Sequence, residues 1–402
     1  MASIKKRLRD RNDPEKGYVW RARVYINGKE YVAHRDRKTD AEGWVDEMKA
    51  AHTIGRFVDP RSGKIPFKTY AEQWRASMGH APLSEQAVEG ILRNHVYPAI
   101  GHLPIGSVRH SALQAMVTGW GKHLGARSIN TAWEHVKAVF LAAKRDRVVA
   151  ELPTEGVKIP SVPHREVEIP PLAALDVLRK NLPEEYRVVV DLVVGSGLRP
   201  GEVFGLEIGA RGLDSLGRRV NVCQQRIDEP RKAPYLAPLK TDASERVVPL
   251  AQVTVDALAA HLAQHPATTL AVWDHADRRR PVKREATVLF AREDQLMDGS
   301  KWSRLWRPAA KAAGLNPATG LHVLRHLYAS LLIRHNESVK TVQHRLGHAK
   351  ATTTLDTYGH LWDDADDTTR AAITEALTGV STSGDIGAVS STVNTTTLRR
   401  AD

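Results

Sequence analysis

Hydrophobic and polar positions near the start of the chain follow the pattern of a small sheet. Residues 18–26 mix Tyr, Trp and Val with Arg, Asn27-Gly28 follows, and residues 29–34 run back, which predicts a hairpin closed by a type I′ turn. Thr39-Asp40-Ala41-Glu42 then has the form of a capping box and predicts a helix that runs to about His52. We expect a three-stranded sheet backed by one helix, and the pattern is compatible with either face of the sheet being exposed.

The next part of the chain is patterned for helices. Residues 55–66, with two prolines and two glycines, predict a linker, and apolar residues then recur at helical spacing. A proline-rich stretch over 152–171 predicts a second boundary. Between the two we expect an all-α domain, with helices over about 69–78, 84–96, 111–122 and 128–147.

Beyond the second boundary helical and strand patterns are mixed. Residues 186–195 predict a buried helix, and a longer helix is predicted over 321–335. Two short helices follow, over 341–346 and from about 352 to Tyr358. The predicted strands cover 219–227, 235–240 and 245–250, with a turn at 241–244. The expected fold class is therefore a multidomain chain that is mainly α with small β-sheets.

The charge of the chain points to a polyanionic partner. Its 402 residues include 58 Lys and Arg against 46 Asp and Glu, a formal net charge of +12, which is a common footprint of nucleic-acid binding. Residues 1–38 alone hold twelve basic and five acidic residues. This segment is either a DNA-contacting arm, which we favour, or the solvated face of a structural cap. The candidate DNA contacts are Arg21, Arg23 and Lys29 in the sheet and Arg93, Arg127 and Lys137 in the helical domain.

Composition argues against several other classes of protein. No segment approaches about 18 uninterrupted apolar residues, and the basic start is followed by no apolar stretch, so we expect neither a membrane span nor a secretory signal. Cys223 is the only cysteine, which excludes an intramolecular disulfide and a multi-thiolate zinc site. A single thiol fits a reducing compartment, so we expect an intracellular protein.

Six residues in the C-terminal half have the chemistry to break a phosphodiester. Two guanidiniums can hold the non-bridging phosphate oxygens, Lys and His can move protons, and a phenol can attack phosphorus. Each residue alone has an ordinary structural explanation, such as a surface charge or a packed ring, but the set predicts cleavage through a phosphotyrosine link. The six are Arg199, Lys240, His322, Arg325, His348 and Tyr358.

The predicted elements place these residues at ends and faces. Arg199 is expected beside a helix N-terminus, which is a natural site for an anion. Lys240 is expected at the tip of a hairpin. His322 and Arg325 are three residues apart and should share one face of their helix, and Tyr358 should lie at a helix end where the chain can move.

Together these residues resemble one family, the tyrosine recombinases or phage integrases. The resemblance covers about residues 60–370 and rests on the order and spacing of several strings. Val323 stands where the family often has an acidic residue and Leu327 where Thr or Ser is common, and neither carries the chemistry. The strings are Gly197-Leu-Arg-Pro-Gly-Glu202, Leu239-Lys-Thr-Asp-Ala-Ser-Glu-Arg-Val-Val-Pro-Leu250, Leu321-His-Val-Leu-Arg-His326, Leu346-Gly-His348 and Thr354-Leu-Asp-Thr-Tyr358.

The resemblance implies a role for each of the six residues. The two arginines would hold the scissile phosphate while Tyr358 attacks it and forms a 3′-phosphotyrosine. His322 would be the base for the phenol, Lys240 the acid for the departing 5′ oxygen, and His348 a hydrogen-bond donor to the phosphate. Neither a metal nor a cofactor is implied.

The resemblance also implies domains and partners. The domains would be an arm-type DNA-binding domain (1–60), a helical, SAM-like core-binding domain (64–155), a mixed α+β catalytic domain (165–378) and a low-complexity tail (379–402). The partner would be double-stranded DNA with attachment sites, on which a homotetramer exchanges strands through a Holliday junction. A directionality factor and a DNA-bending protein would assist, and the work would take place in the bacterial cytosol, at the nucleoid.

Two other functions use the same residues. A type IB topoisomerase has a similar constellation and would relax supercoils as a monomer, but the arm-like N-terminus argues against it. A DNA-binding relative without activity could keep the fold, but here all six catalytic positions are filled. We therefore predict a site-specific recombinase, an integrase that inserts and excises the DNA of a phage or another mobile element.

Overall fold

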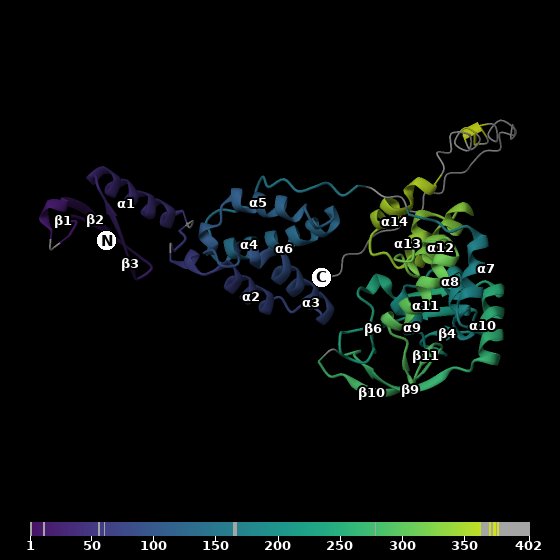
Figure 1. The fold of residues 1–402 in the computed structure, drawn as a ribbon. Helices are drawn as coiled ribbons and strands as arrows, with labels where there is room; N and C mark the ends of the chain where they lie inside the picture. The colour runs from purple at the N-terminus through teal and green to yellow at the C-terminus, as the bar shows by residue number, and fades with distance from the viewer. Residues whose placement is uncertain are drawn as a thin grey trace, which may run out of the picture. The chain divides into compact units, whose positions relative to one another are not determined.

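A computed structural model shows two compact units, Met1–His164 and Arg165–Asp402 (Figure 1). The predicted tail, 379–402, lies outside the described residues, and the domain limits within the first unit stay a prediction. The structure describes residues 2–10, 13–54, 57–59, 61–163, 167–277 and 279–362, together with 370, 373, 374, 376 and 377.

The first unit begins with a three-stranded antiparallel sheet backed by a helix (Figure 1). Strands β1 (Ala2–Leu8), β2 (Tyr18–Ile26) and β3 (Lys29–Arg35) lie in that order, and α1 (Lys38–Thr53) packs on one face. The turn between β2 and β3 has φ values of 51° at Asn27 and 75° at Gly28, as a type I′ turn requires. The predicted hairpin is confirmed.

The capping box predicted for this helix is wrong. The helix begins at Lys38, with Arg37 as N-cap and no side-chain cap hydrogen bond. Only two residues separate β3 from α1, so the chain must turn into the helix before Thr39. Glu42 pairs instead with Lys38, one turn back, at 3.2 Å.

A second hydrophobic core in this unit belongs to a set of helices, as predicted. Large side chains such as Phe67, Trp133 and Phe140 fill it. The second of the four predicted helices is longer than expected, because a π-helical turn (Leu92–Val96) carries it on into a further short helix. The helices are α2 (Phe67–Ser77), α3 (Pro82–Ile91), α4 (Tyr97–Ile100), α5 (His110–Trp120) and α6 (Ala126–Arg145), with 3-10 turns at Ser62–Lys64 and Ile105–Ser107.

The second unit mixes helices with small sheets, which confirms the predicted fold class. Its helices are α7 (Leu172–Asn181), α8 (Val188–Ser196), α9 (Pro200–Phe204), α10 (Gln252–Gln264), α11 (Gly299–Ala312), α12 (His322–Arg334), α13 (Val339–Leu346) and α14 (Ala351–Tyr358). Its strands are β4 (Leu213–Asp214), β5 (Arg219–Val222), β6 (Gln224–Ile227), β7 (Tyr235–Pro238), β8 (Arg246–Pro249), β9 (Thr268–Asp274), β10 (Val282–Val288), β11 (Ala291–Arg292) and β12 (Gln295–Leu296).

The strand pairing differs from the prediction. The strand predicted over 219–227 breaks at Cys223 into β5 and β6, which belong to different sheets, ordered β4-β5-β8 and β10-β9-β7-β6. The hairpin predicted around Lys240 is therefore wrong, because β7 pairs with β6 and β9 whereas β8 pairs with β5. A local turn signal marks a change of direction, but burial selects the partner strand: Val248 of β8 enters the main core and Leu236 of β7 a smaller one.

Helices α8 and α12 contact each other in the main core of this unit. Helix α12 is buried on most sides, including Val323, Leu324 and Leu327. The expected shared face of His322 and Arg325 is only partly found, since His322 is exposed and Arg325 is buried. Among the described residues, no helix combines the length and the apolar character needed to span a membrane.

Candidate active site

A sharp turn between two helices positions Arg199. Gly197 ends α8 with a left-handed φ of 65°, and a Cβ there would lie 2.3 Å from the Tyr328 ring, so the turn needs glycine. Arg199 is then the N-cap of α9, beside a helix N-terminus as predicted, and proline follows it in the first turn. Its side chain is 32% exposed.

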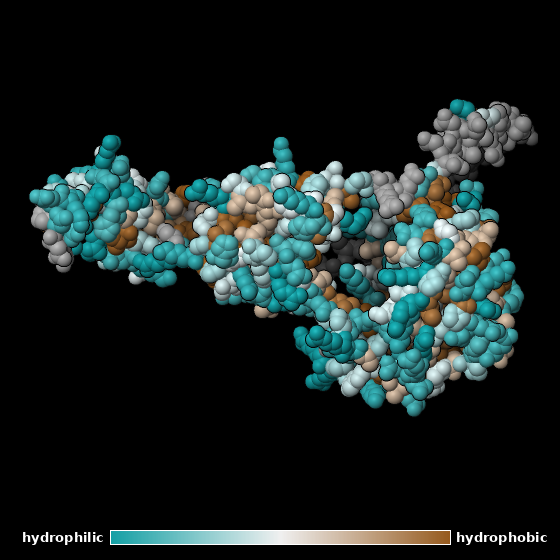
Figure 2. Space-filling view, in the orientation of Figure 1, coloured by the Kyte–Doolittle hydropathy of each residue, from teal (hydrophilic) through white to brown (hydrophobic). Residues whose placement is uncertain are grey.

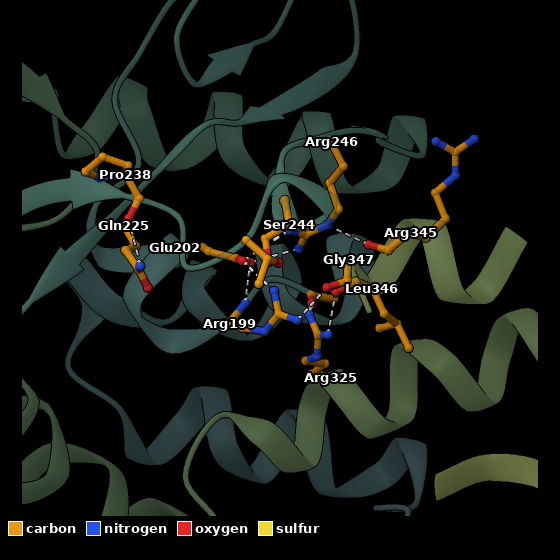
Figure 3. A network of polar contacts seen from close by, with 12 residues as sticks. Arg199, Glu202, Gln225, Pro238, Ser244, Arg246, Arg325, Arg345, Leu346 and Gly347 are labelled. Atoms are coloured by element: carbon orange, nitrogen blue, oxygen red, sulfur yellow. Dashed lines mark hydrogen bonds and ion pairs between the residues drawn. The ribbon is translucent and has the colours of Figure 1, made fainter. Parts of the chain in front are cut away.

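A buried carboxylate supports this turn (Figure 3). Glu202 accepts hydrogen bonds from the Arg199 backbone N–H at 2.8 Å and from Arg199 Nη1 at 2.9 Å. It also accepts from Nη2 and Nη1 of Arg246, at 2.8 and 3.1 Å. Burial alone raises the pKa of Glu202, but the hydrogen bonds and charge of Arg246, with the charge of Arg199, bring that pKa below its ordinary value. The predicted anion position beside α9 is thus filled by a carboxylate of the chain itself.

Arg246 joins three segments of the site (Figure 3). Its side chain is fully buried, with 0% exposed. Besides Glu202, the guanidinium donates to the carbonyl of Ser244 at 2.9 Å and to that of Arg345 at 2.8 Å. Ser244 belongs to the segment that carries the predicted lysine, and Arg345 lies in the last turn of α13. One side chain therefore holds the α9 turn, the lysine segment and α13 together.

Arg325 lies inside the fold, with 4% exposed. It donates from Nη1 to the Gly197 carbonyl and from Nη2 to the Leu346 carbonyl, both at 2.5 Å. Arg199 reaches the next carbonyl, that of Gly347, at 2.8 Å. Burial and then the charge of Arg199 lower the pKa of Arg325 to about 9, so the group is still cationic at neutral pH. Main-chain oxygens at the end of α13 thus anchor both guanidiniums.

His322 and His348 lie near these guanidiniums. His322 opens α12, and His348 follows α13 with its Nδ1 2.9 Å from Thr354 Oγ1. Although the His322 side chain reaches solvent, the protein around both rings removes part of their hydration, and this desolvation, followed by the charges of Arg325 and Arg199, lowers both pKa values, that of His348 to about 4. Both imidazoles are therefore neutral at pH 7.

The predicted nucleophile, Tyr358, ends α14 and is 1% exposed. Its Oη lies 2.7 Å from Nδ1 of His326, and the two rings meet edge to face with centroids 5.6 Å apart. Burial, opposed by the charge of Arg325, raises the pKa of Tyr358 to about 12. The phenol is therefore protonated, and its partner is a histidine for which the sequence predicted no role.

Lys240 stands apart from the other five predicted residues, which converge around the end of α13. It is exposed on the segment between β7 and β8. Within the described part of the chain, no hydrogen bond or ion pair joins it to the rest of the site. A long side chain on an exposed segment reaches a cleft only when a ligand or a movement brings the two together, so its catalytic role stays a prediction.

The N-terminal sheet has a basic outer face. Strand β2 buries Ala22, Val24 and Ile26 on the side of α1, so alternation directs Arg21 and Arg23 to the other side. Register and alternation place basic residues of β1 on that side too, and Figure 2 shows hydrophilic residues over much of the visible surface here. This outer face carries Lys5, Arg7, Arg21 and Arg23.

Lys29, the third predicted DNA contact of the sheet, lies elsewhere. It is opposite Ile26 in the register, so it belongs to the face that packs on α1. Its Nζ is 3.7 Å from a carboxylate oxygen of Asp59. The structure therefore separates Lys29 from the basic outer face.

The predicted contacts of the helical domain are surface residues. Arg93 is 65% exposed and pairs with Glu89 at 3.3 Å, and Lys137 is 43% exposed and pairs with Glu134 at 2.7 Å. Arg127 is exposed in the first turn of α6. Each can reach a ligand, and none is tied into the core.

The sequence did not predict three residues of the site, Glu202, Arg246 and His326. All three lie within the strings that carry the family resemblance. For the first two a signal was present, because each charge directly precedes apolar residues of a buried segment, and buried charges need partners. For His326 only its place one residue after Arg325 could have drawn attention.

Comparison with known proteins agrees with this geometry. Residues 170–364 match the model of the Phage integrase family. The integrase of Mycobacterium phage D29 is 24% identical over 337 residues, which cover 80% of this chain and 84% of that protein. Tyrosine recombinase XerC 1 of Ralstonia nicotianae is 29% identical over 261 residues, 61% of this chain and 72% of that protein.

Solved structures share the fold. The Tn1549 transposon integrase in complex with transposon right end DNA aligns with a TM-score of 0.64 at 19% identity, over 78% of this chain and 100% of that chain. A lambda integrase tetramer bound to a Holliday junction aligns with a TM-score of 0.53 at 17% identity, over 86% of this chain and 93% of that chain. The family match covers the residues that form the site, and this segment of the chain, residues 170–364, belongs to the phage integrase family of tyrosine recombinases.

Proposed function

We propose that this protein is a site-specific DNA recombinase that cleaves and rejoins DNA to integrate and excise a phage or another mobile element. The observation that carries the proposal is the convergence of two anchored guanidiniums, two neutral histidines and a phenol around the end of α13. These groups lie inside the segment that matches the family. They are the parts that cleavage through a phosphotyrosine needs.

The guanidiniums would bind the scissile phosphate. Arg199 and Arg325 each use two of five N–H donors within the protein. The remaining donors are available to the non-bridging oxygens, and these hydrogen bonds strengthen as negative charge builds up in the transition state. His348, a neutral imidazole with one N–H, adds a further donor to the phosphate.

Cleavage and resealing would be one reaction in two directions. Tyr358 Oη forms a bond to phosphorus while the bond to the 5′ oxygen breaks, and Lys240 protonates that oxygen. The 3′-phosphotyrosine keeps the energy of the phosphodiester, so a 5′ hydroxyl from another strand can reseal it. His322, the base expected from the sequence, makes no hydrogen bond to Tyr358 among the described residues, and we assign it to the phosphate.

The partner would be double-stranded DNA with attachment sites. Two sites would be paired by four copies that exchange strands through a Holliday junction, and the DNA-bound integrases of similar fold support this assembly. The basic outer face of the sheet, within residues 1–60, would contact arm sites, and residues 64–155 and residues 165–378 would each contact the core site. A directionality factor and a DNA-bending protein would complete the complex, in the bacterial cytosol.

Covalent trapping tests the proposal. The full chain is incubated with nicked suicide duplexes from its own flanking DNA, and a denaturant-resistant protein–DNA band is expected. Tyr358→Phe should bind the same DNA and form no band. If wild type binds and forms no band on any flanking duplex, the proposal is wrong, and site-independent relaxation of a plasmid would point to a topoisomerase instead.

A further inference from the structure

His326 touches the atom that would attack phosphorus. Its Nδ1 lies 2.7 Å from Tyr358 Oη, a distance at which a base can take a proton. The ring planes meet at 61°, and the tyrosine is 1% exposed, so water has little access to the phenolic proton. No second hydrogen bond to this phenol occurs among the described residues.

We propose that His326 is a catalytic residue of strand cleavage, the base that takes the phenolic proton of Tyr358. This assignment rests on the proposed function and deepens it. It requires the imidazole to carry its hydrogen on Nε2, so that the phenol donates its hydrogen bond to Nδ1. The residue that the sequence suggested for this task, His322, then acts elsewhere in the site.

The step balances in protons and electrons. As the Tyr358 Oη–phosphorus bond forms, the phenolic proton passes to His326 Nδ1. The electron pair of the breaking bond goes to the 5′ oxygen, which takes a proton from Lys240. The enzyme gains one proton and gives one, and resealing returns both.

The surroundings keep His326 unprotonated before DNA arrives. Burial and then the nearby His322 and Arg325, on the same helix, lower the pKa of His326 to about 4. His348, from the turn after α13, and Tyr358, from α14, face it as well. A phosphate bound at Arg325 would offset the positive charge, which raises the pKa of the imidazole and makes it a stronger base when the substrate is in place.

The pH dependence of covalent-complex formation tests this assignment. Single-turnover cleavage of the nicked suicide duplexes is measured for wild type, His326→Asn and His335→Asn, all as full chains. Asparagine can keep a hydrogen bond to the phenol but cannot take its proton. His335, at the other end of α12, is exposed and serves as the matched control. A fluorinated tyrosine at position 358, which has a more acidic phenol, is placed in wild type and in His326→Asn.

We expect His326→Asn to cleave roughly 10²–10⁴-fold more slowly at pH 7. Its residual rate should rise about tenfold per pH unit, because hydroxide must then remove the proton, and fluorinated tyrosine should recover part of the loss. His335→Asn should match wild type. The inference is overturned if His326→Asn cleaves as fast as wild type. It is also overturned if His326→Asn cleaves more slowly but keeps the pH dependence of wild type and gains nothing from fluorinated tyrosine. If wild type forms no covalent complex at all, the proposed function fails first and this inference falls with it.

Discussion

Arg246 and Glu202 form an ion pair whose side chains are 0% and 2% exposed, joined by hydrogen bonds of 2.8 and 3.1 Å. Glu202 in turn holds the Arg199 guanidinium at 2.9 Å. The pair therefore contacts Arg199, one of the groups that would bind the phosphate, and would not bind the phosphate itself. Its role is to position the neighbouring groups, because all three nitrogens of the Arg246 guanidinium already donate hydrogen bonds within the protein and Glu202 accepts from both arginines.

Removing Arg246 should cost stability as well as activity. Loss of one partner leaves Glu202 buried without its main hydrogen-bond donor, which typically costs about 3–5 kcal/mol. We expect urea unfolding to show that the free energy of unfolding of Arg246→Met is lower than that of wild type by an amount of that order. Arg219→Met removes an exposed pair with Asp214 and should leave the free energy of unfolding nearly unchanged, and equal losses in the two variants would contradict the prediction.

Arg325→Lys should separate binding from chemistry. Lysine keeps the positive charge but cannot bridge the Gly197 and Leu346 carbonyls and still present a fork to the phosphate. We expect covalent-complex formation to fall about 10²–10³-fold, as for the loss of a transition-state donor, while DNA binding in a gel-shift assay changes little. Arg334→Lys, exposed at the end of the same helix, is the control, and the expectation fails if it loses as much activity.

Gly197→Ala should damage both the turn and the arginine that depends on it. The residue has a φ of 65°, and a Cβ would meet the Tyr328 ring at 2.3 Å. Strain of this kind costs about 1–3 kcal/mol, so thermal unfolding should shift downward and cleavage should fall with it. Gly119→Ala, near the C-terminal end of α5 and with no atom within 4 Å of the new Cβ, should instead be neutral or stabilising. A neutral Gly197→Ala would show that the turn relaxes freely.

Stability should depend on pH through two histidines. The pKa of His326 and that of His348 are both lowered to about 4 by burial and nearby positive charge, against about 6.5 in an unfolded chain. The unfolded chain therefore binds more protons between these values, and the free energy of unfolding should fall as pH drops from about 6.5 to about 4. Urea titrations across this range should show a shallower slope for His348→Asn, and the same slope as wild type for the exposed His335→Asn.

Arm binding should depend on the outer face of the sheet. Arg21→Gln combined with Arg23→Gln removes two cations from that face, so the slope of log affinity against log salt should become less negative by about one for each lost phosphate contact. Lys29→Gln serves as a matched control because that lysine lies opposite Ile26, on the face of the sheet that packs on α1. If Lys29→Gln alters the slope as much as the arginine variant does, the face has been assigned wrongly.

The sequence predicted what local patterning controls. The Asn27-Gly28 turn, the helices of the first unit and the buried helix that became α8 were all visible in short stretches, because turn residues and apolar period act over a few positions. The site residues came from their order along the chain. Five of the six do converge in the structure, although their roles stay predictions.

The features that the sequence did not predict depend on contacts between segments that are far apart along the chain. The partner strands of β7 and β8 are chosen by which core each strand can enter, so the hairpin at Lys240 could not be excluded locally. Arg325 is buried because carbonyls from residues 197 and 346 solvate it, and no helical pattern contains them. The contact of His326 with Tyr358 likewise spans 32 positions and two helices.

Because Arg325 is anchored by two backbone oxygens, its orientation depends on the path of the chain at residues 197 and 346, whereas Arg199 shares its anchor between the Gly347 carbonyl and the Glu202 side chain. A carbonyl is supplied by every amino acid, so the contact at residue 346 needs no particular side chain, and the buried Leu346 side chain serves the core while α13 ends at Gly347 in the left-handed conformation. The positions that resist change should be those where the chain turns.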